Sequence, residues 1–135
     1  YVPAYIHTLI LDGSYIHGRE RMVLVALTDT GAICWHFVPR ETTETWRELL
    51  IRLPRPMVVV CDGHAGLLSA VSSLWPGIVI QRCHFHIAKL ARHYLSLRPK
   101  TEAGKEAKNL IAIIPRVKTA EEENEWHAAY AAWKR

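Results

Sequence analysis

Residues 57–63 read Met-Val-Val-Val-Cys-Asp-Gly, and this stretch decides the fold of the chain. Its apolar and β-branched residues predict a short strand that is buried on both faces, as central strands of parallel sheets are. Asp62 follows at the carboxyl end of that strand, the edge of an open α/β sheet where ligands bind. The strand therefore predicts both a central position in a sheet and a functional carboxylate.

A second apolar run has the same ending. Residues 4–12 predict a buried strand that closes in Asp12-Gly13. Residues 22–28 and 32–38 predict two more strands, and Asp29-Thr30-Gly31 between them is a hairpin signal. The first three strands should therefore form an antiparallel meander.

Connectivity brings the two aspartates together. Thr42 or Thr43 should cap a helix that runs through Leu53, and a right-handed helical crossover returns the fourth strand parallel to the first. Asp12 and Asp62 then lie at the same end of adjacent strands. A further helix and a strand at residues 78–80 complete an α/β, ribonuclease-H-like mixed sheet with three antiparallel and two parallel strands and flanking helices.

The C-terminal part predicts helices alone. A helix is expected over residues 83–97, and two more over about 102–114 and 120–134, separated by Pro115. We therefore expect a partial catalytic core over residues 1–98 and part of a helical insertion segment over 99–135. The first residue is Tyr1 and the last residues fall within a predicted helix, which indicates a fragment of a larger protein.

The composition suits a globular domain with a mildly basic charge. Half of the 135 residues are hydrophobic and the net charge is +4, which is compatible with a nucleic-acid partner but does not require one. The three cysteines are an odd number and favour a reducing compartment over a disulfide framework. The sequence shows no membrane helix and no signal peptide.

The aspartates suggest metal chemistry. Taken singly, Asp12 is an ordinary turn residue and Asp62 an ordinary helix N-cap. As a pair on neighbouring strands, they supply the oxygen ligands that Mg²⁺ prefers, and two such ions cleave or join phosphodiesters.

Two further groups of residues have both structural and functional interpretations. Cys83 and His86 form a C-x2-H spacing that suits Zn²⁺, although a structural zinc needs four ligands and a small buried cysteine is the commoner role. Arg82, Lys89 and Arg92 belong to a basic cluster that is either a solvated helix face or a set of contacts to DNA phosphates.

Four segments together resemble a known family. They are LILDGSYI (9–16), RETTETW (40–46), VVVCDGHAGLLSAV (58–71) and WPGIVIQRCHFHIAKL (75–90). In order and spacing they resemble the catalytic core of Mutator-superfamily transposases, which include many bacterial insertion-sequence enzymes. The resemblance covers about residues 5–95.

The resemblance implies a DDE-type transposase that cleaves DNA and transfers strands at transposon ends. Its two catalytic, metal-binding aspartates map onto Asp12 and Asp62, which would hold two Mg²⁺ or Mn²⁺ ions with a glutamate. The family's C-x2-H maps onto Cys83 and His86. The glutamate follows the helical insertion, so none of the acids at 121–125 is assigned and the third acid is expected outside this chain. The chain alone should then be inactive.

The same resemblance implies DNA as partner, homo-oligomers in the complete enzyme, no membrane, and a bacterial cytoplasmic, nucleoid-associated location. Two alternatives remain open. One is another nuclease of the ribonuclease-H fold, which would carry an early helix acid such as Glu44 or Glu48. The other is a non-catalytic, zinc-stapled module for DNA binding or dimerisation.

Overall fold

The computed structural model describes residues 1–16, 18 and 20–135. Contacts within the chain divide it into two compact units, Tyr1–Cys83 and His84–Arg135. The predicted division into a core over 1–98 and an insertion over 99–135 stays a prediction.

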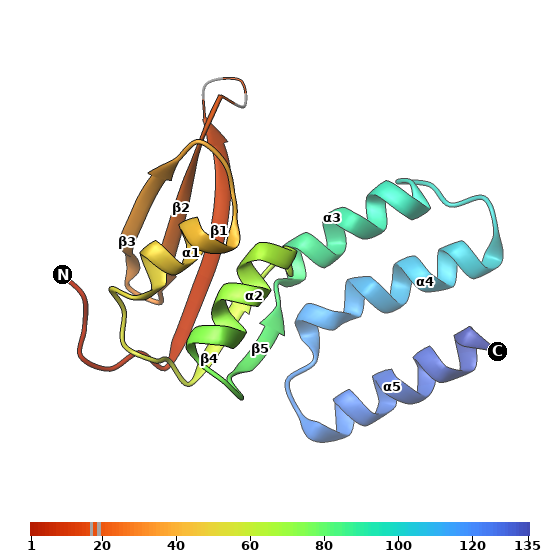
Figure 1. Ribbon diagram of the computed structural model, residues 1–135. Coiled ribbons are helices and arrows are strands. Elements are labelled where there is room, and N and C mark those ends of the chain that lie inside the picture. The colour runs from red at the N-terminus through yellow and green to blue at the C-terminus, as the bar shows by residue number, and fades with distance from the viewer. Residues whose placement is uncertain (17, 19) are drawn as a thin grey trace. The chain divides into compact units, whose positions relative to one another are not determined.

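The first unit is built on a five-stranded mixed sheet with the strand order β3-β2-β1-β4-β5 (Figure 1). Antiparallel pairs join β1 to β2 and β2 to β3, and parallel pairs join β1 to β4 and β4 to β5. This confirms the predicted ribonuclease-H-like arrangement of a meander and two parallel strands. The strands are β1 (Thr8–Ile16), β2 (Arg21–Thr28), β3 (Gly31–Val38), β4 (Val58–Cys61) and β5 (Val79–Arg82).

The core of this unit lies between the sheet and two helices, α1 (Thr43–Leu50) and α2 (Ala65–Leu74). Thr42 is the N-cap of α1, as the sequence predicts, and its hydroxyl accepts a 3.1 Å hydrogen bond from the Thr45 N–H. Alternate strand residues and the apolar sides of both helices are buried together. They include Leu9, Leu11, Leu24, Val59, Trp46, Leu49, Leu67 and Val71.

Strand boundaries differ from the prediction in ways that matter for the site. β1 does not end at Asp12: it continues to Ile16, because its pairing with β2 runs through Ile16 and Arg21. Pairing with β4 stops earlier, at Ile10 and Val60. β4 was predicted to be buried on both faces, but Val58 and Val60 are only half-buried. In this unit the helices bury Val59 and Cys61 on the alternate face.

The second unit consists of α3 (His84–Leu95), α4 (Glu102–Ile113), a short 3-10 turn (Ile114–Arg116) and α5 (Ala120–Lys134). The two last helices agree with the predicted ranges. Capping explains where they begin, since the hydroxyls of Thr101 and Thr119 accept hydrogen bonds from Gly104 and Glu122. Backbone N–H groups of Lys118 and Thr119 also lower the pKa of the Glu122 carboxyl.

Two tryptophan side chains of α5 form hydrogen bonds with the main chain of α4. The indole of Trp126 donates to the Leu110 carbonyl and that of Trp133 to the Ala103 carbonyl, each at 2.8 Å. Tyr130 stacks on both indoles, with ring centroids 5.4 and 5.9 Å apart. These contacts within the helical unit explain how α4 and α5 form a hairpin despite the exposed α5 surface.

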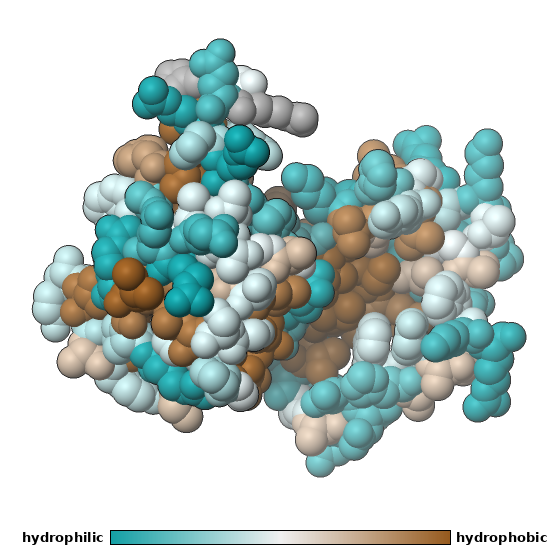
Figure 2. All heavy atoms as spheres, in the orientation of Figure 1, coloured by the Kyte–Doolittle hydropathy of each residue, from teal (hydrophilic) through white to brown (hydrophobic). Residues whose placement is uncertain are grey.

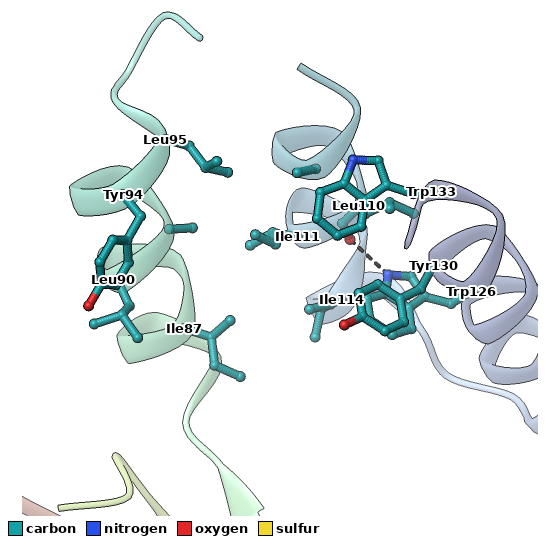
Figure 3. A pocket seen from close by; sticks show the side chains of 12 residues that line it. Ile87, Leu90, Tyr94, Leu95, Leu110, Ile111, Ile114, Trp126, Tyr130 and Trp133 are labelled. Carbon is teal, nitrogen blue, oxygen red and sulfur yellow. Dashed lines mark hydrogen bonds between the residues drawn. The ribbon is translucent and has the colours of Figure 1, made fainter. Parts of the chain in front are cut away.

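An apolar groove of about 540 Å³ lies within the helical unit. Ile87, Leu90 and Tyr94 of α3 line it together with Ile111 of α4 and Ile114 of the 3-10 turn (Figure 3), and the aromatic residues of α5 close one side. Figure 2 shows apolar atoms gathered there. None of the described helices is long and apolar enough to cross a membrane.

Candidate active site

The two predicted aspartates follow the last paired residues of two adjacent parallel strands. Ile10 of β1 pairs with Val60 of β4, and the same register continued by two residues would bring Asp12 opposite Asp62, which directly follows β4. Leu11 and Cys61 are buried under the helices, whereas both aspartates are half-buried. The sequence predicts two carboxylates side by side at the end of this parallel pair, and that contact stays a prediction; Asp12 itself lies inside β1 and not at its end.

The backbone after β4 turns sharply to begin α2. One carboxylate oxygen of Asp62, Oδ1, accepts a 2.9 Å hydrogen bond from the backbone N–H of His64. The N-cap of α2 is His64 rather than Asp62, so the simple capping role considered for Asp62 is wrong. The bond holds the Asp62 carboxylate against its own loop through Oδ1, and Oδ2 takes no part in this bond.

Gly63 and Arg82 pack against each other in this turn. Gly63 has a φ of 86°, a left-handed conformation that glycine adopts without strain. Arg82, the last residue of β5, lies next to Cys61 in the parallel register, and its Nε donates to the Asp62 carbonyl at 3.1 Å. A Cβ on residue 63 would fall on the Arg82 guanidinium. The arginine therefore occupies space that only glycine leaves open.

Glu41 supports the same loop from the helix side, and sequence reasoning missed it. Its Oε1 accepts a 2.8 Å hydrogen bond from the indole of Trp46, which is completely buried, and lies 3.5 Å from Nδ1 of His64. Glu41 also approaches Gly13, whose side of β1 is opposite to that of Asp12. It is therefore a support for the loop and not a third member of the aspartate pair.

Cys61 is the last residue of β4, is completely buried and directly precedes Asp62. Burial raises the pKa of its thiol, and the neighbouring Asp62 charge raises it further. The carbonyl of Cys61 accepts a 2.7 Å hydrogen bond from the N–H of Cys83, which extends the pairing of β4 with β5 by one step. The thiol thus acts as a small apolar side chain.

The other predicted site residues are divided between the two units. Lys89, Arg92 and His86 belong to the helical unit, whereas Cys83 closes the first unit. Glu48 of α1 pairs with His36 of β3 at 2.7 Å, and Glu44 is exposed in the first turn of α1. Neither acid joins Asp12 and Asp62, so neither supports the alternative nuclease.

The donor set fits part of a site for a hard cation. Asp12 and Asp62 offer carboxylate oxygens, the ligands that Mg²⁺ and Mn²⁺ take in proteins. Across residues 1–16, 18 and 20–135, no three His, Cys, Asp or Glu side chains are grouped closely enough to hold a metal ion. The aspartate pair therefore needs further ligands, and the zinc-stapled alternative stays a hypothesis.

Residues 9–135 match the family model described as transposase, Mutator family. The chain belongs to this family. The transposase for insertion sequence element ISRM5 of Rhizobium meliloti (strain 1021) is 32% identical to it, over 64% of this chain and 26% of that protein. The chain thus spans about a quarter of the length of this curated relative.

The contact between Gly63 and Arg82 predicts that adding a single methyl group at residue 63 lowers the free energy of unfolding by an unusually large amount. Gly63→Ala should destabilise the first unit by more than the ~1–2 kcal/mol of left-handed strain, because the guanidinium must also move. Gly77→Ala is the matched control, since Gly77 has a φ of 73° but open space around it. Urea unfolding measures both variants. Equal losses would show that Arg82 does not occupy the space beside Gly63.

The bond between Glu41 and Trp46 predicts a second loss. Glu41→Ala leaves a buried indole N–H without its acceptor, which should cost about 1–3 kcal/mol of unfolding free energy. Glu41→Gln keeps an acceptor oxygen and should lose less. Glu48→Ala removes an exposed acid of α1 and should cost about 0–1 kcal/mol in the same urea experiment. A Glu41→Ala variant as stable as Glu48→Ala would contradict this role.

Proposed function

We propose that this chain supplies the catalytic core of a DDE-type transposase, which cleaves DNA and transfers strands at transposon ends in a metal-dependent reaction. One observation carries the proposal: in a chain of the Mutator family, the β1–β4 pairing ends at Ile10 and Val60, and the same register continued by two residues would bring Asp12 opposite Asp62. Asp12 and Asp62 are the proposed catalytic residues. The third acid belongs to a part of the enzyme outside residues 1–135, so residues 1–135 alone should not cleave DNA.

Asp12 and Asp62 would hold Mg²⁺ or Mn²⁺. When bound, such ions activate an attacking water or 3′ hydroxyl and stabilise the charge on the phosphate. The protein's own contribution is to keep two carboxylates adjacent in spite of their repulsion. The strand register, continued past Ile10 and Val60, would do this for both residues, and the N–H of His64 fixes the orientation of Asp62.

DNA is the proposed partner, with transposon ends and target as substrates and a homo-oligomer as the complete enzyme. Lys89 and Arg92 are exposed on α3 and would contact phosphates, a sequence-independent contribution that salt weakens. With DNA as substrate, we place the enzyme at the bacterial nucleoid. Cys83 and His86 keep the family's C-x2-H spacing, and we assign them no chemical step.

Metal titration tests the aspartate pair. Mn²⁺ added to residues 1–135 should bind saturably and broaden NMR signals next to Asp12 and Asp62. Asp12→Asn or Asp62→Asn should weaken binding by at least about tenfold, or ~1.4 kcal/mol, because each removes a charged oxygen ligand. Asp29→Asn is the control, since Asp29 is exposed in the hairpin at the opposite end of the sheet.

The controls separate a specific site from general attraction of cations. Equal weakening in the Asp29→Asn and Asp12→Asn variants would contradict the assignment of the strand pair. Retained Mn²⁺ affinity in both Asp12→Asn and Asp62→Asn would do the same. A Zn²⁺ titration in which Cys83→Ser and His86→Ala lose binding, while the aspartate variants behave as wild type, would favour the zinc-stapled module.

A further inference from the structure

Arg82 is held beside Asp62 by contacts with the main chain. Its Nε donates to the Asp62 carbonyl at 3.1 Å, and its guanidinium lies on Gly63. The side chain is nevertheless exposed. In the part of the chain that the structure describes, Nε makes the one hydrogen bond assigned to the guanidinium, so Nη1 and Nη2 can donate to a ligand.

The position of this guanidinium is narrowly defined. β5 pairs with β4 through Cys61 and Arg82, so the arginine leaves the sheet at the edge where Asp62 follows β4. Gly63, in its left-handed conformation and without a side chain, leaves the space that the guanidinium occupies. An arginine confined in this way loses less side-chain freedom when it binds a ligand than a free surface arginine does.

The chemistry of the group points to a phosphate. A guanidinium binds phosphate oxygens through two parallel N–H donors, and Arg82 keeps a pair of donors after Nε is used. The site lies against the aspartate turn, where a scissile phosphodiester would bind in the proposed reaction. A positive charge there also reduces the repulsion between DNA phosphates and the two carboxylates.

We propose that Arg82, seated on Gly63, is a phosphodiester-binding residue that positions the DNA backbone at the Asp62 turn. This inference rests on the proposed function and adds a specific contact to it. Arg82 differs from Lys89 and Arg92 because its place is set by the sheet of the first unit. Gly63 is the positioning residue of the pair, and it acts on DNA through Arg82.

The salt dependence of DNA binding tests the contact. A labelled duplex is titrated with residues 1–135 over a series of NaCl concentrations, and the slope of log K against log [NaCl] is measured by fluorescence anisotropy. Arg82→Gln should reduce the magnitude of the slope by about 0.9, the value of one phosphate contact. Arg82→Lys should keep the slope and lose affinity, because a point charge replaces the planar donor pair.

A matched arginine controls for charge and for main-chain contact. Arg55 is exposed, lies just before β4 and donates from an Nη to the Pro76 carbonyl at 3.0 Å. Arg55→Gln removes the same charge at the opposite end of that strand and should leave the slope unchanged. Circular dichroism at each NaCl concentration confirms that every variant is folded.

Gly63→Ala tests the contact between Gly63 and the Arg82 guanidinium without removing a charge. It should weaken DNA binding about fivefold or more in the wild-type background and have no further effect in Arg82→Gln, because the two residues act as one unit. Gly77→Ala carries similar backbone strain away from any side chain and should bind DNA as wild type does. Additive losses from Gly63→Ala and Arg82→Gln would overturn the pairing.

The outcomes separate this inference from the proposed function. If the wild-type chain binds DNA and Mn²⁺ but Arg82→Gln keeps the wild-type slope, the Arg82 proposal is wrong and the transposase proposal stands. An Arg82→Gln variant that is less stable but has an unchanged slope contradicts the Arg82 proposal in the same way. If the wild-type chain binds neither the duplex nor Mn²⁺, the proposed function fails and this inference fails with it.

Discussion

The parallel pairing of β1 with β4 is the constraint on which the rest of the first unit depends. It spans three residue pairs, from Thr8 with Val58 to Ile10 with Val60. These pairs join the antiparallel meander to the βα part of the sheet, and they determine which residues meet beyond them. A shift of one residue would move Asp12 to another neighbour and turn the buried side of β4 outwards.

Burial protects that register. Leu9 and Val59 point to the same helix-covered side and are completely buried, together with Leu11 and Cys61. The apolar residues of α1 and α2 complete this core, so slippage of β4 would bring half-buried positions into it. The carboxylates are therefore positioned by hydrophobic packing one residue away, which does not depend on their own charges.

The turn after β4 shows how local and distant constraints combine. Asp62 and His64, two residues apart, make a short hydrogen-bonded turn, and Gly63 between them supplies the required left-handed φ. Arg82 and Glu41 reach the same turn from β5 and from the start of α1. The Asp-Gly pair was recognisable in the sequence, but its two distant partners were not, because no local pattern records which side chains the folded sheet brings together.

The sequence by itself determined the order of strands and helices, and it limited the N-cap of α1 to Thr42 or Thr43, of which Thr42 is the cap. These follow from periodicity, local hydrogen bonding and the handedness of crossovers, all of which act over short stretches of chain. Only the tertiary structure decided that β1 continues past Asp12, that Glu41 braces the loop and that Arg82 rests on Gly63. Each of these depends on contacts between residues far apart in the chain, and such contacts exist only once the sheet and its covering helices have packed.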